Sequence, residues 1–451
     1  MSKRSVTILG AGLVGSVLAV LLRKRGYEVT VYERRPDMRK EAVGAGRSIN
    51  LAMSNRGWKA LELAGLRTEI EAIAIPMPGR FLHQEDGTSA FQAYGKNGEA
   101  IYSVSRGELN KKLMDLAEQN GANIHFNQRC TKVDVQRNTI HLTDEQGQER
   151  ELACDLLFGA DGAFSSLRTA MSFMDRTNFS QHYIEAGYKE LNIPAGPGGS
   201  WPIEKNALHI WPRHNYMMIA LPNIDGSFTC TLFFPFEGDP SFASIKTAAD
   251  VRDFFGRQFP DAVPLMPTLV EDFLNNPVSS LITTRIFPWK YQDKSCLIGD
   301  AAHAIVPFYG QGMNAGFEDC SALEGLMEQY GDDWETILAE LEKQRKPNAD
   351  AVADLALNNF IEMRDKVSDP LFLERKKIEK ELGKRYPGRF NSVYEMVSFS
   401  HTPYAYALHC TKAQDILLGH IQAEGDFFSN IERPEFCERL EGWLKAYEAM
   451  V

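Results

Sequence analysis

The sequence has few cysteines, and none are spaced to form a recognisable site. Its seven cysteines stand singly along 451 residues, with no C-x-x-C pair. An odd number of isolated cysteines excludes a disulfide framework and offers no zinc-ligand spacing. We therefore expect a chain of a reducing compartment, the cytoplasm, with no bound metal.

Long apolar runs are absent as well. Nowhere do 18 consecutive apolar residues occur, so neither a transmembrane helix nor a membrane anchor is predicted. After Lys3 and Arg4 the chain enters an apolar strand that glycines soon interrupt, which is not the pattern of a signal peptide.

Positive charge is also scarce. Lysine and arginine number 49 against 60 acidic residues, giving a net charge of -11. Phosphate binding needs clustered basic residues, so we expect no nucleic acid partner. The length predicts two or three domains. The oligomeric state stays open between a monomer and a homodimer.

The most informative local pattern is glycine-rich and lies near the N-terminus. Gly10, Gly12 and Gly15 form G-x-G-x-x-G between an apolar strand and a helix, and a second strand ends at Glu33. In such a unit the helix N-terminus attracts a pyrophosphate, and the second glycine lets it approach the backbone. A carboxylate at Glu33 suits a ribose 2′-hydroxyl and repels a 2′-phosphate, which favours FAD or NAD over NADP.

Two later stretches repeat the pattern of an apolar strand followed by a glycine-containing turn. Residues 156–168 (LLFGADGAFSSLR) contain an Asp-Gly pair at Asp161, and residues 296–316 (CLIGDAAHAIVPFYGQGMNAG) contain a Gly-Asp pair at Asp300. The three motifs in this order resemble the FAD-dependent aromatic hydroxylases, relatives of p-hydroxybenzoate hydroxylase. The resemblance implies that the N-terminal and the late glycine-rich stretch hold one FAD between them.

The resemblance also implies which residues contact FAD. They are Gly10, Gly12, Val14, Gly15, Glu33, Arg34, Arg35, Ala52, Arg106, Cys130, Asp161, Asp300, Pro307, Gly312, Met313 and Asn314. By itself Arg106 would be a surface residue at a helix start, and the family match gives it a cofactor contact. Arg47 stays open between a solvated loop arginine and a flavin contact. The helix starting near Gly312 would direct its positive end at the flavin.

Five further segments are similar to the family members that hydroxylate L-kynurenine: GRSINLAMSNRG, IPMPGRFLH, VPFYGQGMNAGFEDC, NNFIEMRDKV and VYEMVSFS. This implies NADPH as a transient electron donor, O2 as co-substrate and 3-hydroxy-L-kynurenine as product. The flavin C4a-hydroperoxide would carry the chemistry, without a catalytic side chain. A hydroxylase of a phenolic acid is the alternative, and a non-catalytic relative of the same fold is a more distant one.

The same similarity implies a substrate site made of Arg80, Tyr94, Phe308, Tyr309, Asn359 and Tyr394. Arg80 would bind the substrate carboxylate, with hydroxyls from Tyr94 and Tyr394. Asn359 shares a helical stripe with apolar residues, so it is either a ligand or a core amide bonded to backbone. Tyr394 could equally be a core residue, and the contact of Tyr309 stays open because relatives vary there.

A hairpin prediction tests part of this site. Arg80 and Tyr94 flank Asp86-Gly87, a turn signal. A three-residue loop places both side chains on one face of the sheet, whereas a two-residue loop places them on opposite faces. We predict the odd-length loop.

The predicted fold class is α/β, with a Rossmann-type FAD-binding domain, an antiparallel-sheet substrate domain that interrupts it, and a C-terminal helical region. Alternating apolar residues from Phe228 to Phe234 predict the antiparallel sheet. The predicted parts are 1–75, 101–183 and 289–331 for FAD binding, 76–100 (a hairpin) and 184–288 (the sheet) for the substrate domain, and 332–451 for the helices.

Overall fold

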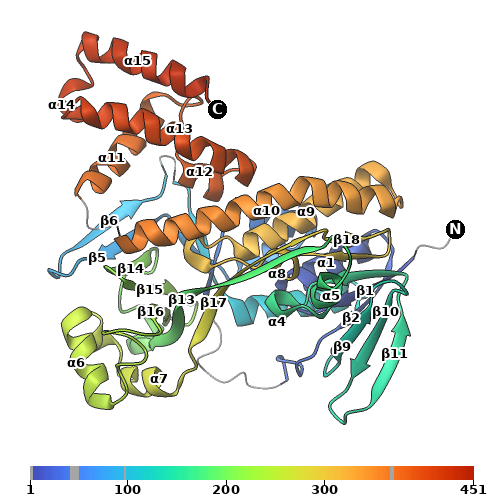
Figure 1. The fold of residues 1–451 in the computed structure, drawn as a ribbon. Coiled ribbons are helices and arrows are strands. Elements are labelled where there is room, and N and C mark those ends of the chain that lie inside the picture. Colours follow the sequence, from blue (N-terminus) through green and yellow to red (C-terminus); the bar gives the residue numbers. More distant parts are fainter. Residues whose placement is uncertain (1–3, 41–49, 96–97, 366–369) are drawn as a thin grey trace.

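The computed structural model describes residues 4–40, 50–95, 98–365 and 370–451. In this part of the chain a mostly parallel sheet and a larger mixed sheet lie side by side, and a long helix crosses both (Figure 1). The C-terminal helices gather at one end of the molecule, beyond that long helix.

The mostly parallel sheet has six strands in the order β18-β19-β12-β1-β2-β8. Their bounds are β1 (Ser5–Leu9), β2 (Glu28–Tyr32), β8 (Asn123–His125), β12 (Leu156–Gly159), β18 (Lys290–Tyr291) and β19 (Ser295–Leu297). Strand β1 pairs in parallel with β2 and β12, and β12 pairs in parallel with β19. The carboxyl ends of these four strands therefore meet at one edge, where open α/β sheets bind ligands.

Helices cover this sheet. They are α1 (Leu13–Lys24), α4 (Arg106–Gln119) and α9 (Gly312–Tyr330). Helix α1 is buried along most of its length and contacts both α4 and α9. Gly26 follows it with a φ of 82°, which ends the helix as the sequence predicts.

The larger sheet has seven strands in the order β17-β13-β16-β15-β14-β5-β6. Their bounds are β5 (Gly79–His83), β6 (Ser89–Ala93), β13 (Asn178–Ile193), β14 (Leu208–Arg213), β15 (Tyr216–Pro222), β16 (Phe228–Pro235) and β17 (Ser279–Phe287). Neighbours are antiparallel except for β5 and β14, which pair in parallel with Leu208 opposite Arg80.

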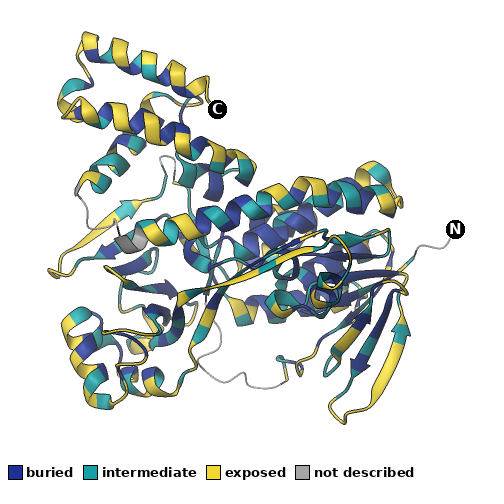
Figure 2. Ribbon diagram, viewed as in Figure 1, coloured by how far each residue is buried: buried dark blue, intermediate teal, exposed yellow. Residues whose placement is uncertain are grey.

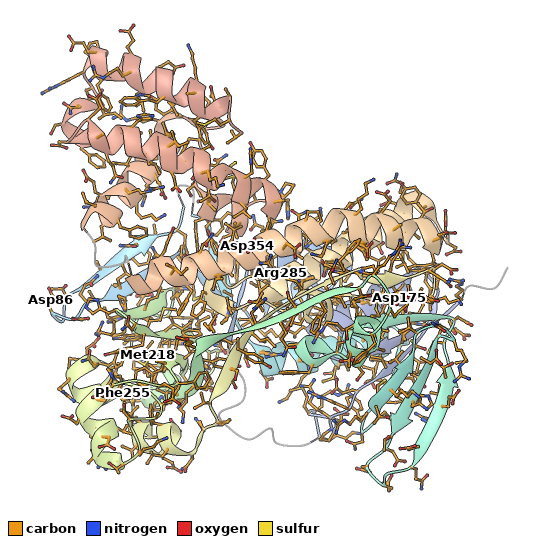
Figure 3. All side chains as sticks on the ribbon, in the orientation of Figure 1. Asp86, Asp175, Met218, Phe255, Arg285 and Asp354 are labelled. Carbon is orange, nitrogen blue, oxygen red and sulfur yellow. The ribbon has the colours of Figure 1, made fainter. Side chains whose placement is uncertain are left out.

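Each face of the seven-stranded sheet packs on helices. Helices α6 (Ala248–Gln258) and α7 (Leu269–Asn275) cover one face, where Met218 of β15 and Phe255 of α6 share a core (Figure 3). The long helix α10 (Trp334–Asp365) covers the other face, where Met217 and Ala356 share a second core. Arg285 of β17 forms an ion pair with Asp354 of α10 (Figure 3).

The hairpin of β5 and β6 confirms the predicted three-residue loop. Arg80 lies opposite Gln92, and the Gln84 amide donates to the Thr88 carbonyl at 2.9 Å, which leaves residues 85–87 as the loop. Side chains two residues apart on a strand share a face, so Tyr94 and Gln92 lie on the face of Arg80. Arg80 and Tyr94 therefore lie on one face of the sheet, as predicted.

Smaller elements complete the core region. One three-stranded antiparallel sheet holds β3 (Asn50–Met53), β7 (Ile101–Ser105) and β4 (Ile75–Met77), and another holds β9 (Arg129–Asp134), β10 (Thr139–Thr143) and β11 (Glu149–Ala153). The remaining α-helices here are α2 (Asn55–Leu63), α3 (Arg67–Glu71), α5 (Ser166–Ser172) and α8 (Asp300–His303).

The C-terminal region is helical, as predicted. It contains α11 (Pro370–Arg385), α12 (Val393–Ser398), α13 (Tyr404–Ala423), α14 (Phe427–Asn430) and α15 (Pro434–Glu448). These helices bury a small core of their own and expose most of their outer faces (Figure 2). Among the described residues, no helix has the length and apolar character needed to cross a membrane.

Candidate active site

The N-terminal glycines divide into two that packing requires and one that faces open space. A Cβ on Gly10, where φ is +97°, would lie 2.6 Å from the Ala160 carbonyl oxygen, and a Cβ on Gly15 would lie 2.1 Å from that of Gly10. A Cβ on Gly12 would meet nothing within 4 Å. Gly12 is also the N-cap of α1 and gives the helix no side-chain cap. This open helix N-terminus fits a pyrophosphate.

Glu33 follows β2 and holds the glycine turn in place. Its Oε2 accepts a hydrogen bond from the Ala11 amide at 2.9 Å, and its Oε1 accepts one from Arg35 Nε at 2.8 Å. Burial alone would raise the pKa of Glu33, but hydrogen bonds and the charge of Arg35 hold that pKa below its ordinary value. The side chain is therefore an anion at neutral pH, and the neighbouring Arg34 is exposed.

Asp161, at the end of β12, carries an unsatisfied oxygen. Its Oδ2 accepts from the Ser166 amide at 2.7 Å, whereas its buried Oδ1 has no hydrogen-bond partner in the described protein. Burial raises the pKa of Asp161. A buried polar atom of this kind needs a donor, and FAD carries several hydroxyl donors. Ser166 Oγ also donates to the Cys130 carbonyl at 2.9 Å, which brings Cys130 to the same edge.

The late Gly-Asp turn touches the N-terminal unit directly. Gly299 has a φ of +60°, and a Cβ there would lie 2.9 Å from Val14 Cγ2. Gly316 of α9 approaches the same valine, with a Cβ position 2.6 Å from Val14 Cγ2. Val14 thus packs α1 against both late glycines, with Asp300 next to this contact at the start of α8. The two distant glycine-rich stretches therefore pack against each other in the fold.

The loop before α9 is tied to β3 by one amide. It contains a 3-10 turn (Pro307–Tyr309) and Gly310 with a φ of +65°. Asn314 Nδ2 donates to the carbonyls of Ala52 and Gly310, both at 2.9 Å, and the side chain is fully buried. Asn314 therefore shapes this loop with its side chain. Gly312 begins α9, and Met313 is buried beside it.

Two arginines remain, Arg106, to which the resemblance gives a cofactor contact, and Arg47, whose role the sequence left open. Arg106 begins α4 and is exposed, three residues after Ser103, which pairs with Ala52. Its position is compatible with a contact to a ligand on the β3 side of the site. Arg47 lies outside the described residues.

The predicted substrate residues come together from four parts of the chain. The rings of Tyr94 and Tyr394 stack with centroids 5.4 Å apart, and those of Tyr309 and Tyr394 stack at 5.8 Å. Burial raises the pKa of all three phenols, most strongly for Tyr94 and Tyr309, and the charge of Arg80 opposes this effect in each case. All three residues keep some accessible surface. Strong desolvation combined with residual access is typical of side chains that line an interior site.

Arg80 is a half-buried cation without a protein counter-ion in the described chain. Its Nε donates to Gln92 Oε1 at 3.2 Å across the hairpin, and no described carboxylate forms an ion pair with it. Gln92 is a neutral amide, so within the described part of the chain Arg80 has a hydrogen-bond partner and no directly paired carboxylate. A desolvated guanidinium favours a bound anion.

Asn359 and Phe308 join α10 to the loop before α9. Asn359 Nδ2 donates to the Phe308 carbonyl at 2.7 Å, so this amide does bond backbone, the alternative that the sequence left open. The Phe308 ring stacks on Phe360 at 4.2 Å and contacts Phe233 at 5.0 Å. Phe308 is thus an apolar wall between the seven-stranded sheet and α10.

Sequence reasoning missed two residues of this cluster. Gln92 orients Arg80, and Phe399 contacts the rings of Tyr94 and Tyr394 at 6.0 and 5.9 Å. The odd-length hairpin already implied a Gln92 opposite Arg80, because the two positions share a face. No local signal marks Phe399, which reaches the site from the end of α12.

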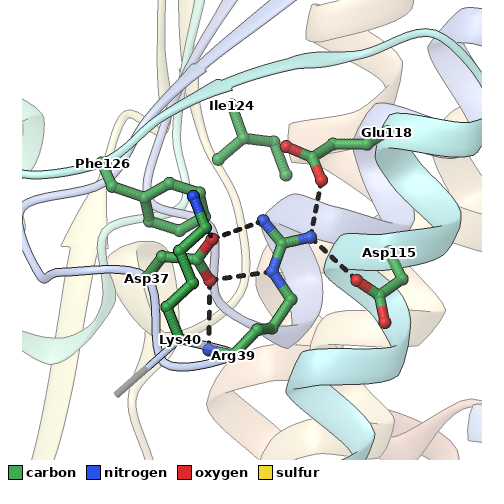
Figure 4. Close-up of a pocket in the computed structure, with 7 residues that line it drawn as sticks. All are labelled: Asp37, Arg39, Lys40, Asp115, Glu118, Ile124 and Phe126. Atoms are coloured by element: carbon green, nitrogen blue, oxygen red, sulfur yellow. Dashed lines mark hydrogen bonds and ion pairs between the residues drawn. The ribbon is translucent and has the colours of Figure 1, made fainter.

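A surface hollow lies elsewhere and is structural. It is lined by Asp37, Arg39, Lys40, Asp115, Glu118, Ile124 and Phe126, none of them a predicted site residue (Figure 4). Arg39 bridges Asp37 at 2.8 Å, Asp115 at 2.9 Å and Glu118 at 2.6 Å. Its charge is already compensated, so the hollow has no evident capacity for an anion.

Comparison with known proteins agrees with this geometry. The FAD binding domain family matches residues 3–238 and 272–356. Curated kynurenine 3-monooxygenases from Flavobacterium johnsoniae and Christiangramia forsetii are 52% and 51% identical to the chain. The alignments cover 89% of this chain and 90% of the first relative, and 98% of this chain and 99% of the second. The solved structure of 2-methyl-3-hydroxypyridine-5-carboxylic acid oxygenase superposes with a TM-score of 0.66 at 22% identity, covering 82% of this chain and 95% of that one.

The fold and the glycine-lined site therefore define an FAD-dependent monooxygenase, an oxidoreductase that uses FAD as its cofactor. Within that class the chain belongs to the kynurenine 3-monooxygenase family. The predicted fold class is confirmed, including the helical C-terminal region.

Proposed function

We propose that the enzyme hydroxylates L-kynurenine at C3 to give 3-hydroxy-L-kynurenine, with O2 as co-substrate and NADPH as electron donor. The names of its relatives support this substrate. The observation that carries the proposal is the charge of Arg80, which forms no ion pair among the described residues, beside three strongly desolvated phenols. Kynurenine has a carboxylate that such a charge would bind and an aromatic ring that needs an apolar wall.

Each substrate residue then has a distinct task. Arg80 binds the carboxylate, and the hydroxyls of Tyr94 and Tyr394 stay protonated and donate to the same group, because burial keeps their pKa values high. Asn359 and Tyr309 face the polar atoms of the substrate, and Phe308 supports its ring. These side chains orient the substrate and exclude water, which contributes to the rate without a protein nucleophile.

FAD is held at the carboxyl edge of the parallel sheet, and when bound it supplies electron transfer and oxygen activation. Gly12 would hold the pyrophosphate, Glu33 a ribose hydroxyl, and Asp161 and Asp300 further hydroxyls. The main chain from Pro307 to Asn314 would hold the flavin ring, since the Asn314 side chain is already engaged.

The division into domains is part of the same proposal. Strand β5 pairs with β14 of the seven-stranded sheet, and β6 pairs with β5, which supports assigning 76–100 and 184–288 to one substrate domain. Strand β13 of that sheet begins earlier, at Asn178. We also propose a cytoplasmic enzyme, since all seven cysteines are free thiols.

Product analysis tests the function directly. Purified enzyme is incubated with NADPH and either L-kynurenine or salicylate, and products are identified by mass spectrometry. We expect 3-hydroxykynurenine in the first reaction and no hydroxylated product in the second. Hydroxylation of salicylate instead would support the phenolic-acid alternative, and a colourless protein without flavin absorbance would contradict both.

A further inference from the structure

Helix α12 carries Tyr394 into the substrate cluster, yet it is only six residues long. A helix of this length is not stable by itself. Its N-terminus is fixed by a capping box in which the side chains and amides of Ser392 and Glu395 bond one another. Its C-terminal carbonyls need partners as well, and they find them on a helix of the FAD-binding region.

The first two residues of α2 bind this end of α12. Asn55 Nδ2 donates to the Phe399 carbonyl at 2.8 Å. Arg56 Nε donates to the Val397 carbonyl and Arg56 Nη2 to the Met396 carbonyl, both at 3.3 Å. A cation is favourable at a helix C-terminus because the carbonyls there carry partial negative charge. Asn55 and Arg56 together cap α12 from outside its own sequence.

Arg56 is also bound on its other side. Its Nη1 forms an ion pair with Glu318 of α9, and its side chain is fully buried. Glu318 is shared with Arg345 Nη1 at 2.7 Å, which holds the carboxylate in place from α10. The Arg56 guanidinium lies 3.9 Å from the ring centroid of Tyr404 at the start of α13. One side chain therefore connects α9, which starts at the flavin loop, with the end of α12 and the start of α13.

Tyr404 completes the connection to the flavin loop. Its hydroxyl donates to Gln311 Oε1 at 2.9 Å, and Gln311 is the N-cap of α9. A chain of buried polar contacts thus fixes the position of α12, which carries Tyr394, relative to the loop from Pro307 to Gly312. A buried network in which each member is bonded fixes geometry tightly.

We propose that Arg56 is a positioning residue that sets the placement of Tyr394, and thereby of the substrate, relative to the flavin loop. This inference rests on the proposed function. Arg56 does not contact the substrate cluster itself, so its loss should disturb substrate placement while the FAD site around Gly12 and Asp161 stays intact. A displaced substrate should lower the yield of hydroxylated product per NADPH, because the two electrons from NADPH then reduce O2 to hydrogen peroxide instead.

The test compares Arg56→Gln with Arg25→Gln. Arg25 makes the matching contact elsewhere on α9, with Nη2 2.7 Å from Glu324 Oε1, and it lies on the α1 side away from Tyr394. Asn55→Ala serves as a milder second variant that removes the bond to Phe399. The measurements are FAD content, melting temperature, kynurenine KM and the ratio of 3-hydroxykynurenine formed to NADPH consumed.

We expect Arg56→Gln to raise KM roughly tenfold, the size of losing a charge-assisted hydrogen bond, and to lower the product ratio with FAD still bound. Asn55→Ala should change KM and the product ratio in the same directions, but by smaller amounts. Arg25→Gln should leave both at wild-type values even where its melting temperature falls. If Arg56→Gln does not fold, Asn55→Ala decides: wild-type KM and product ratio in that variant overturn the inference. Wild-type enzyme that forms no 3-hydroxykynurenine would instead refute the proposed function.

Discussion

At the scale of single residues, the proposed substrate site depends on one cation that forms no ion pair in the described part of the chain. Arg80 is half-buried and bonded to the neutral Gln92. Three phenols around it are kept protonated by burial. The site is therefore organised before the substrate arrives, with a positive charge and neutral donors already in place. Such preorganisation reduces the cost of ordering on binding.

The first prediction concerns Arg80 itself. Arg80→Ala should raise the kynurenine KM strongly, because truncation removes a charge-assisted pair worth on the order of 2–4 kcal/mol. FAD should stay bound, since the side chain lies on the substrate sheet and not on the β1–α1 turn. Steady-state kinetics and the flavin spectrum check this. Unchanged kynurenine affinity would refute the role of Arg80.

The second prediction concerns Gln92. Gln92→Leu frees Arg80 Nε and should raise KM by about fivefold, equivalent to about 1 kcal/mol for a lost hydrogen bond. Gln92→Glu should do more damage, because its carboxylate would pair with Arg80 and compete with the substrate. Gln84→Leu, on the same face near the loop, is the control and should behave as wild type. Equal KM values for Gln92→Glu and wild type would contradict the orienting role.

At the scale of elements, the sequence predicted the features that depend on residues close together in the chain. The strand, the glycine turn and the helix from Ser5 to Lys24 follow from spacing alone. The parity of a short loop determined that Arg80 and Tyr94 share a face. The features that the sequence did not predict depend on contacts between residues far apart in the chain, such as the parallel pairing of β5 with β14. The capping of α12 by Arg56 is of the same kind, because nothing in NRG or VYEMVS indicates that these segments meet.

The pairing of β5 with β14 brings together two histidines, which make the free energy of unfolding depend on pH. His83 Nε2 of β5 lies 2.9 Å from His209 Nδ1 of β14. The other ring nitrogen of His209, Nε2, lies 2.8 Å from the Glu204 carbonyl oxygen. A carbonyl only accepts, so His209 Nε2 carries the proton. Burial, the largest cause, lowers the pKa of His209 from 6.5 to about 4. The folded protein therefore keeps this ring neutral at a pH where the unfolded chain protonates it.

The third prediction follows from that difference. As the pH falls from 6.5 to 4, the unfolded chain binds a proton that the folded protein does not, so the free energy of unfolding should fall by roughly 3 kcal/mol. Below pH 4 both states are protonated and this contribution levels off. Denaturant unfolding across this range should show a shallower slope for His209→Gln. His182→Gln, an exposed position on β13, should keep the wild-type slope, and an unaltered slope in His209→Gln would contradict the assignment.

At the scale of the whole molecule, the proposed substrate site draws on residues from several separate parts of the fold. Arg80 and Tyr94 come from the hairpin, Tyr309 from the loop before α9, Asn359 from α10, and Tyr394 from the C-terminal helices. A ligand that contacts all of them joins the seven-stranded sheet, the FAD-binding region and the helical region. Binding should therefore stabilise the whole chain and not one element.

That coupling gives the last prediction. A ligand at 100 times its Kd stabilises the folded state by about 2.7 kcal/mol, which for 451 residues corresponds to a rise in Tm of about 3 °C. Kynurenine added to the FAD-loaded enzyme without NADPH should produce this rise, because binding does not require turnover. Arg80→Ala, in which the carboxylate loses its partner, should show little rise at the same concentration, whereas Arg25→Gln should respond as wild type. A rise of equal size in Arg80→Ala would mean that kynurenine binds without this cation, and the substrate would then have to be placed elsewhere in the molecule.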